Sequence, residues 1–422
     1  MARVLLMLPT RTYRTPALLA AAARCGVELT VASEESSSLA HLNPSGLLTL
    51  PFSSPEQVAE PVLAFHRDHP IDAVIGVDDT VVEAAAVAAR VLGLPHNDPE
   101  AVALARDKRL SREAFAAAGV RSPEFAWRSF DDSRRADRPG FGFPAIVKPL
   151  QLSAGRGVIR VDSSEELAVA IERLEKILES ESDCTTRSGF LVESFVAGPE
   201  VALEGLLRGS ALEVLAIFDK PEPLEGPYFE ETIYLTPSRL DEGRQRLLFE
   251  TAADACRAVR LREGSVHVEM RLTPEGPVVI EVNPRAIGGL CSEVLRFGTG
   301  LSLEDLLLNH ALGDRAPLPP RMATAAGVMM LPVPAAGRLV RVDGLDAAAE
   351  VPGIQRVAIT AHPGQLLQPW PEGSPYPGFL FARGKTCEDV QQALHEAHRK
   401  LTLVLDEPSQ GCNGTGDGDA RR

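Results

Sequence analysis

The segment from Gly264 to Gly289, GSVHVEMRLTPEGPVVIEVNPRAIGG, constrains the fold of this chain more than any other. Apolar residues alternate with polar ones in its first half, which is the period-two pattern of a half-buried strand. The pattern predicts strands over Ser265–Leu272 and Pro277–Val282, joined by a turn that contains Pro274 and Gly276. An antiparallel hairpin is therefore expected here.

Two carboxylates face each other in this hairpin. If its loop is the three residues Pro274–Gly276, Glu269 lies directly opposite Glu281. Facing carboxylates repel and destabilise a sheet, so a positive charge should lie between them. A divalent cation held by oxygen ligands fits best, with Asn283 as a third oxygen donor on the same face. Arg285 adds a cation for a phosphate, so the hairpin predicts a metal–nucleotide site.

Composition excludes several classes of protein. A chain of 422 residues with 45% hydrophobic and 24% charged residues is expected to be a soluble globular protein of two or three domains. The net charge of −15 argues against sequence-independent nucleic-acid binding. The six cysteines show no metal-binding spacing, which favours a reducing cytoplasm. The first apolar run is too short for a signal peptide, and we expect no membrane segment.

Residues 1–105 are predicted to form an N-terminal parallel α/β domain, because strands alternate with helical segments. Its ligand crevice would lie at the carboxyl ends of the strands, near Pro9–Arg14 and Asp78–Thr80. The dinucleotide fingerprint G-x-G-x-x-G is absent, so no dinucleotide is expected. The predicted strands are Val4–Leu8, Glu28–Ala32 and Ile71–Val77.

Residues 106–315 are predicted to form a second, central domain of mixed helices and strands. A helical pattern over 99–119 contains Asp107 and Lys108 in its interior. Further helices are predicted over 163–178, 243–259 and 303–312, and strands over Phe143–Lys148, Val158–Val161, Phe190–Ser194, Glu200–Leu207 and Leu212–Phe218.

The composition shifts to Pro, Gly and Val after about Arg315, which predicts a β-rich C-terminal module over 316–405. The sequence leaves open whether this module covers an active site or forms the contacts of a homodimer. Residues 406–422 have almost nothing to bury and are predicted to be a disordered tail.

A glycine-containing loop follows the strand that ends at Lys148. Gly155 and Gly157 would let backbone N–H groups approach phosphate oxygens, and Lys148 supplies a point charge. The next strand ends at Glu193 and is followed by Glu200, which could contact an adenine amino group and ribose hydroxyls. Each feature alone is more often an ordinary turn or a solvated strand end.

Taken together and in order, these segments resemble the ATP-grasp superfamily of carboxylate–amine ligases. The form E-x-N-x-R-x-x-G-G after HVE is most similar to the amino-acid ligase (dipeptide synthetase) branch. The matching segments are DK (107–108), PAIVKP (144–149), SAGRG (153–157), LVESFVAGPE (191–200), HVEMRL (267–272) and EVNPRAIGG (281–289).

The resemblance implies a central domain of two α+β subdomains that binds ATP with Mg²⁺, or with Mn²⁺ in its place. It implies that ATP contacts Lys108, Lys148, Ser153, Gly155, Gly157, Glu193, Ser194, Val196 and Glu200. It further implies metal binding by Glu269, Glu281 and Asn283, and stabilisation of an acyl phosphate by Arg285 together with Lys148.

The reaction implied by the resemblance is ADP-forming C–N bond formation between small molecules, with amino acids as the expected substrates. Candidates for the base that deprotonates the amine are His267 and the pair Glu230-Glu231. Substrate contacts are expected at Gly288, Gly289 and Arg296 as well. Two alternatives stay open: another ATP-grasp reaction on an intermediate of nucleotide metabolism, and an ATP-binding regulatory protein without turnover.

Overall fold

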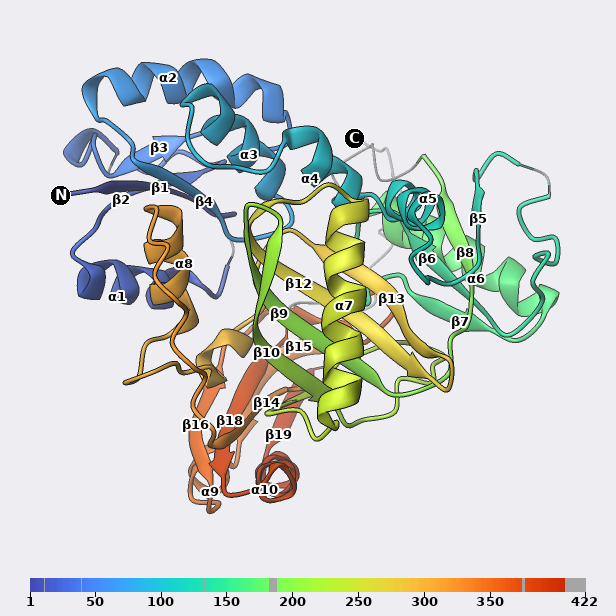
Figure 1. Cartoon of the computed structure of the whole chain (residues 1–422). Coiled ribbons are helices and arrows are strands. Elements are labelled where there is room, and N and C mark those ends of the chain that lie inside the picture. Colours follow the sequence, from blue (N-terminus) through green and yellow to red (C-terminus); the bar gives the residue numbers. More distant parts are fainter. Residues whose placement is uncertain (11, 39, 133, 182–187, 374–375, 407–422) are drawn as a thin grey trace, which may run out of the picture.

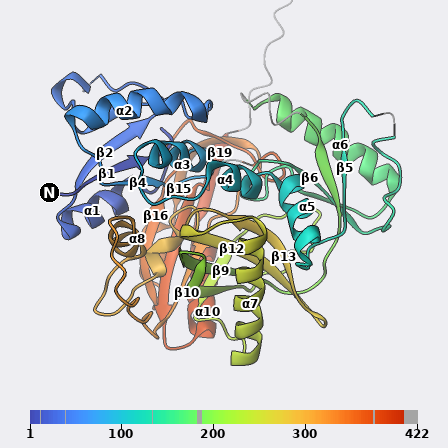
Figure 2. The same ribbon diagram turned by 45° about the horizontal axis from the view of Figure 1, so that its top comes forward.

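The computed structural model describes residues 1–10, 12–38, 40–132, 134–181, 188–373 and 376–406 (Figure 1). The N-terminal domain and a small sheet with its helix lie at opposite ends of the molecule, and a large sheet lies between them (Figure 2). The predicted tail lies outside the described residues, except for Asp406. None of the described helices is long and apolar enough to cross a membrane.

The N-terminal domain is a four-stranded parallel sheet, as predicted, with the order β3-β2-β1-β4. Alternate residues of β1 face opposite helices: Leu5 and Met7 pack in the cluster of α2 and α3, and Leu6 packs against Leu18 of α1. Strand β3 and helix α2 were not predicted. The elements are β1 (Arg3–Met7), α1 (Thr15–Cys25), β2 (Glu28–Ser33), η1 (Ala40–Leu42), β3 (Leu47–Thr49), η2 (Pro55–Val58), α2 (Ala59–Asp68), β4 (Ala73–Gly76) and α3 (Val82–Val91).

Two helices, α4 (Pro99–Arg106) and α5 (Lys108–Ala118), replace the single helix predicted over 99–119. Asp107 breaks the helix because its backbone is extended and its side chain accepts hydrogen bonds from the N–H groups of Arg109 and Leu110. An aspartate at this position satisfies N–H groups that a helix start leaves unpaired. Lys108 therefore lies in the first turn of α5, where it is buried rather than on a solvated helix surface.

The central domain begins with a small antiparallel sheet in the order β5-β8-β6-β7. Helix α6 packs its apolar residues against this sheet in one buried cluster. The N-terminus of α6 is capped by Ser163, whose hydroxyl accepts a hydrogen bond from the N–H of Glu166. The elements are β5 (Phe125–Arg128), β6 (Ala145–Pro149), β7 (Ile159–Val161), α6 (Ser164–Glu179) and β8 (Phe190–Ser194).

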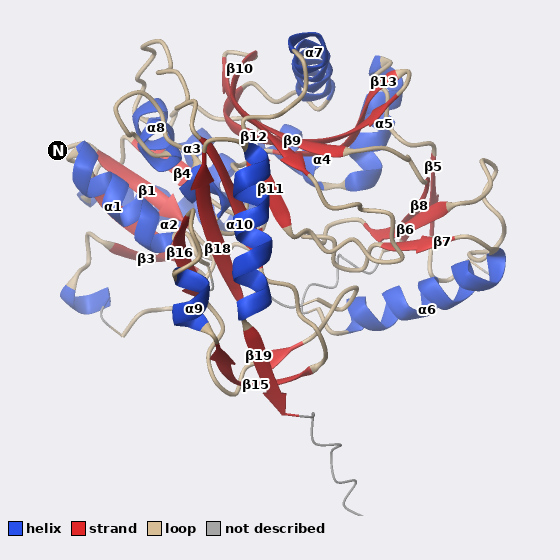
Figure 3. Cartoon of the chain, turned by 90° about the horizontal axis from the view of Figure 1, so that it is seen from below, coloured by secondary structure: helices blue, strands red, loops and turns tan. Residues whose placement is uncertain are grey.

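A large antiparallel sheet has the order β13-β12-β9-β10-β11-β14-β18-β16. Three strands of the predicted C-terminal module, β14, β16 and β18, extend this sheet, a continuity that the sequence pattern did not reveal. Helix α7 packs on the half formed by β9, β12 and β13, and α10 lies along β18 (Figure 3). The elements are β9 (Glu200–Arg208), β10 (Ala211–Lys220), β11 (Ile233–Thr236), α7 (Glu242–Ala258), β12 (Glu263–Thr273), β13 (Gly276–Asn283), β14 (Ala325–Met330), β16 (Ile354–Ile359), β18 (Gly378–Gly384) and α10 (Cys387–Lys400).

The remaining elements connect the domains. Helix α8 packs back on the N-terminal sheet, where Leu308 joins Val4 and Ala21 in one buried cluster. A three-stranded sheet in the order β17-β15-β19 completes the C-terminal module. These elements are η4 (Cys291–Val294), α8 (Leu303–Ala311), β15 (Gly337–Asp343), α9 (Leu345–Ala349), β17 (Leu366–Leu367) and β19 (Thr402–Asp406).

The acidic hairpin consists of β12 and β13, and Glu269 lies opposite Glu281 as predicted. The route to this register differs from the prediction. Thr273 already pairs with Gly276, so the turn holds two residues, and a register shift between Glu269 and Met270 restores the pairing of the two glutamates. A β-bulge places one extra residue on one strand, which has the same effect on the register as a longer turn.

Candidate active site

Two adjoining cavities open where the N-terminal domain, the small sheet and the large sheet meet. The larger cavity measures about 530 Å³ and the smaller about 110 Å³. The larger one includes Asp78 and Asp79, so the crevice predicted at the carboxyl end of β4 does face the site. Both cavities are lined by Ser153, Ala154, Gly155, Glu231, Glu269 and Glu281.

The smaller cavity gathers the residues predicted to bind a nucleotide. They come from α5, β6, β8 and the start of β9, which converge on the phosphate loop, residues 153–157. Gly157 is the exception: it lines neither cavity, and its N–H donates to the carbonyl oxygen of Pro371 at 2.9 Å. The predicted nucleotide residues that do line this cavity are Lys108, Lys148, Ser153, Gly155, Glu193, Ser194, Val196 and Glu200.

Glu193 holds a buried ion network rather than a free carboxylate. Its oxygens lie 2.6 Å from Lys148 Nζ and 2.8 Å from Arg112 Nε. Burial lowers the pKa of Lys148 to about 8, against the opposing effect of Glu193. A contact from Glu193 to an adenine amino group, through its backbone or its side chain, stays a prediction. In the structure both of its carboxylate oxygens face cations, one of which is Lys148 at the cavity wall.

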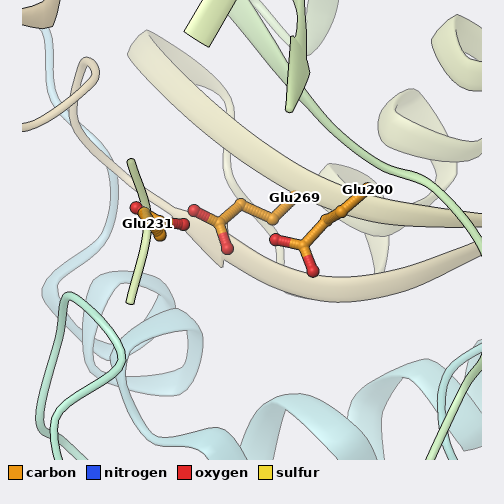
Figure 4. A group of neighbouring side chains, drawn as sticks. All are labelled: Glu200, Glu231 and Glu269. Carbon is orange, nitrogen blue, oxygen red and sulfur yellow. The ribbon is translucent and has the colours of Figure 1, made fainter. Parts of the chain in front are cut away.

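Three carboxylates, those of Glu200, Glu231 and Glu269, point toward one another beside this cavity (Figure 4). One oxygen of each lies within 4.8 Å of the others, which is close enough for a shared metal ion. The ammonium group of Lys220 already lies among them: its Nζ is 2.7 Å from Glu200 and 3.4 Å from Glu269, and it also contacts Glu231. A lysine therefore supplies the positive charge that this cluster needs.

Glu200 also forms an ion pair with a second cation, Arg271. Its other oxygen accepts a hydrogen bond from Arg271 Nε at 2.9 Å. Arg271 also donates to the carbonyl oxygen of Val196 at 2.8 Å, which was a predicted backbone contact for adenine. Glu200 and Val196 both line the smaller cavity, so their predicted contacts with the nucleotide stay predictions.

The oxygen donors predicted to bind a metal lie together on the wall of the larger cavity. Glu269 and Glu281 face each other across β12 and β13, and Asn283 lies two residues beyond Glu281. Lys108 Nζ lies 3.0 Å from Glu281, so a protein cation compensates this carboxylate in the absence of a metal. Two carboxylates and an amide oxygen from one rigid strand pair are a donor set that fits a hard divalent cation.

His267 was a candidate base, and it lies between two carboxylates. Its Nδ1 contacts the carboxylate of Glu204, and its Nε2 lies 3.0 Å from Glu269 Oε1. Burial alone would lower the pKa of His267, but the two carboxylates outweigh burial and raise it to about 9. Both ring nitrogens of His267 face carboxylates, and a base at this position stays a prediction.

Arg285 is held by an aspartate of the N-terminal domain. Its Nε and one terminal nitrogen lie 2.8 and 2.7 Å from the two oxygens of Asp79. Such a two-point contact fixes the plane of the guanidinium. Burial would lower the pKa of Arg285, but Asp79 outweighs it and raises the pKa. Arg285 therefore stays charged and lies fixed on the wall of the larger cavity.

A loop of the C-terminal module contacts the phosphate loop, as one of the two possibilities left open by the sequence requires. Trp370 Nε1 donates to the carbonyl oxygen of Ala154 at 2.7 Å. Arg156 Nε donates to the carbonyl oxygen of Glu372 at 3.1 Å, beside the contact between Gly157 and Pro371. The module thus forms part of the active-site wall.

Gly155→Ala is expected to lower the free energy of unfolding by about 1–3 kcal/mol, because it strains the backbone of this loop. The residue has φ +70°, and an added Cβ would lie 2.2 Å from the carbonyl oxygen of Phe229. Urea unfolding measures the loss. Gly140→Ala is the control, since Gly140 is exposed and has open space for a Cβ. Equal stability of the two variants would contradict the expectation.

The predicted substrate residues divide into two groups. Gly288, Gly289 and Glu231 line the larger cavity. Glu230 lines neither cavity, and its Oε1 accepts a hydrogen bond from the N–H of Val333 at 3.2 Å. Arg296 lies on a different cavity and donates to the carbonyl oxygens of Glu293 and Leu295, so the structure does not bring it together with the other predicted substrate residues.

Arg296→Ala should leave ATP-dependent turnover within about twofold of the unmodified chain, because surface polar contacts contribute little. The measurement is the rate of ADP release at saturating and limiting substrate. A tenfold rise in the substrate KM would restore Arg296 as a binding residue.

Several residues of the site were missed by sequence reasoning. Asp79 could have been found, because it follows an apolar strand at the predicted crevice. Arg14 ends the other segment of that crevice and also lines the larger cavity. No local sequence pattern marks Lys220 or Trp370 as part of the site, since their partners lie in distant parts of the chain.

Comparisons with known proteins agree with this geometry. Three family models match in the expected order: an ATP-grasp N-terminal domain over residues 19–96, an ATP-grasp domain over 141–294, and an L-amino acid ligase C-terminal domain 2 over 329–406. A crystal structure of an L-amino acid ligase from Bacillus licheniformis superposes with a TM-score of 0.79 and 25% identity, covering 96% of this chain and 99% of that one. The chain belongs to the ATP-grasp superfamily, in its L-amino acid ligase branch.

The sequence of this ATP-grasp chain is also similar to those of two curated proteins. An uncharacterised protein of Sinorhizobium fredii is 29% identical over 275 residues, which cover 65% of this chain and 56% of that protein. An alanine–anticapsin ligase of Bacillus amyloliquefaciens is 27% identical over 281 residues, which cover 63% of this chain and 59% of that protein. The matches thus span little more than half the length of these relatives.

Proposed function

We propose that this chain is an ADP-forming ligase that activates a carboxylate as an acyl phosphate and joins it to an amine, with amino acids as both substrates. The observation that carries the proposal is the junction of the two cavities. The first three residues of the phosphate loop and the acid pair Glu269 and Glu281 line both of them. A nucleotide in the smaller cavity would therefore present its terminal phosphate to a substrate in the larger one.

In the first step the substrate carboxylate attacks the γ-phosphate of ATP, and ADP leaves. Lys148 and Lys108 provide positive charge at the phosphates, and Arg285 faces the reacting carboxylate. Positioning and charge neutralisation contribute most of the catalysis in phosphoryl transfer. A divalent cation held by Glu269, Glu281 and Asn283 would supply further neutralisation of phosphate charge.

In the second step the amine attacks the acyl carbon, and phosphate leaves as the amide forms. Water must be excluded, because an acyl phosphate hydrolyses readily. The phosphate loop and the Trp370 loop that covers it form the wall that separates the reaction from solvent. Glu231 is another candidate base, but its carboxylate is tied to Lys220 and to the Tyr234 hydroxyl.

Support for amino acids as substrates comes from the relatives. One solved structure that covers most of the chain is called an L-amino acid ligase, and one curated relative is called an alanine–anticapsin ligase. The size of the larger cavity, about 530 Å³, is also ample for two small molecules joined in one site.

The test is ADP and phosphate release with Mg·ATP against amino acids, singly and in pairs, with mass detection of products. The proposal expects release that depends on a pair, and a product mass equal to the sum of the two minus water. Turnover with a nucleotide intermediate in place of amino acids would favour the first alternative reaction. ATP binding without turnover on any substrate would favour a regulatory protein.

A further inference from the structure

Arg14 is a buried cation without an ion-pair partner among the described residues. Its side chain lies on the wall of the larger cavity, and the residue is 4% exposed. One terminal nitrogen donates to the carbonyl oxygen of Val77 at 3.1 Å, but Nε has no hydrogen-bond partner in the described structure. Burying a guanidinium group without an ion-pair partner costs free energy, and an anion bound beside it would offset that cost.

Two of the three acids near Arg14, Glu204 and Glu304, are already committed to other groups, and the third, Asp78, lines the larger cavity. Glu204 contacts His267 and accepts a hydrogen bond from the N–H of Ile287 at 3.1 Å. Glu304 accepts a hydrogen bond from the Ser292 hydroxyl at 2.6 Å. Burial accordingly lowers the pKa of Arg14, against the weaker opposing effect of these acids. The missing anion is therefore expected from a ligand in the cavity.

We propose that Arg14 binds the free carboxylate of the amine substrate and so selects an amine that carries a carboxylate. This assignment rests on the proposed ligase function. The carboxylate that becomes the acyl phosphate must lie beside Arg285 and the acid pair at the junction of the cavities. Both arginines line the larger cavity, but Arg285 is held by Asp79, whereas Arg14 has no ion-pair partner among the described residues and is available for the other carboxylate.

The surroundings of Arg14 suit one end of a zwitterion. Arg14 directly precedes α1, whose amino terminus carries the positive end of the helix dipole. Asp78 lines the same cavity and offers an acceptor for an ammonium group. One wall thus presents a cation and a carboxylate, which is the complement of an α-amino acid.

The first measurement compares an amino acid with its carboxamide as the amine substrate, at a fixed carboxylate substrate. In the unmodified chain, the carboxamide should raise the amine KM about 10- to 100-fold, as expected for the loss of a charged hydrogen bond. In Arg14→Met the amino acid should be bound as weakly as the carboxamide, and Arg14→Lys should recover part of the preference. Arg90→Met, an exposed arginine of the same domain, should behave as the unmodified chain.

The second measurement isolates the first half-reaction. Hydroxylamine replaces the amine and traps the acyl phosphate as a hydroxamate, so no amine carboxylate is needed. Arg14→Met should keep hydroxamate formation within about twofold while its amine KM rises. A fall in hydroxamate yield equal to the fall in ligation would place Arg14 on the activated carboxylate and overturn the assignment.

The comparison in the unmodified chain does not depend on any variant folding. If the amino acid and its carboxamide are ligated with equal KM, Arg14 does not bind the carboxylate of the amine substrate. The proposed ligase function would be unaffected by that result. If the unmodified chain ligates no amine at all, the proposed function fails, and the role of Arg14 fails with it.

Discussion

Glu281→Gln is expected to reduce ATP turnover by about a thousandfold or more, since metal-ion neutralisation of phosphate charge is worth several kcal/mol. The carboxamide keeps the shape of the side chain but removes one of the two anionic ligands that face each other across the hairpin. ADP release measures the loss, and Mn²⁺ binding followed by electron paramagnetic resonance should weaken in parallel.

A matched control lies in the same hairpin. Glu275 is exposed in the turn, so Glu275→Gln makes the same chemical change without touching the cavity. It should leave turnover and Mn²⁺ affinity unchanged. Near-normal turnover in Glu281→Gln would remove the metal assignment, whereas a loss of turnover with unchanged Mn²⁺ affinity would reassign Glu281 to positioning Lys108.

Lys220→Met should lower the free energy of unfolding by about 3–5 kcal/mol, as expected when one partner of a buried ion cluster is removed. Glu200, Glu231 and Glu269 would then face one another without the ammonium group that lies among them. The deficit should shrink as the pH falls, because burial raises the pKa of Glu231 and its protonation removes one of the facing charges. Urea unfolding at several pH values provides the measurement.

The same variant tests whether the lysine takes the place of a metal ion. Mg²⁺ should restore stability to Lys220→Met and have a smaller effect on the unmodified chain, because the vacated cluster offers three oxygen ligands. Lys176→Met, an exposed lysine on α6, is the control and should cost less than about 0.5 kcal/mol. Equal stability of the two variants would contradict the account of the cluster.

Local patterns predicted the parts of the site that a single element contains. Glu269 and Glu281 could be paired because strand alternation and a short turn fix a hairpin register. The turn length was nevertheless wrong by one residue, and a bulge compensated for it. Asp107 was read as part of a continuous helix, although aspartate is a common residue at the N-cap of a helix.

Contacts between distant segments could not be predicted. Asp79 and Arg285 are 206 residues apart, and Trp370 reaches Ala154 across 216 residues. Alternation and turn signals are local, so they do not say which arginine reaches the cavity. For this reason Arg296 was chosen as a substrate contact, whereas Arg14 was placed only at the end of a predicted crevice segment.

The most direct test of the ligase account follows the oxygen of the activated carboxylate. The carboxylate substrate is labelled with ¹⁸O at both oxygens, and the inorganic phosphate released during ligation is analysed by mass spectrometry. An acyl phosphate intermediate requires that one labelled oxygen leaves with the phosphate, so each phosphate should carry one ¹⁸O and ADP should form in equal amount. Phosphate without label, or AMP with pyrophosphate in place of ADP, would contradict the account.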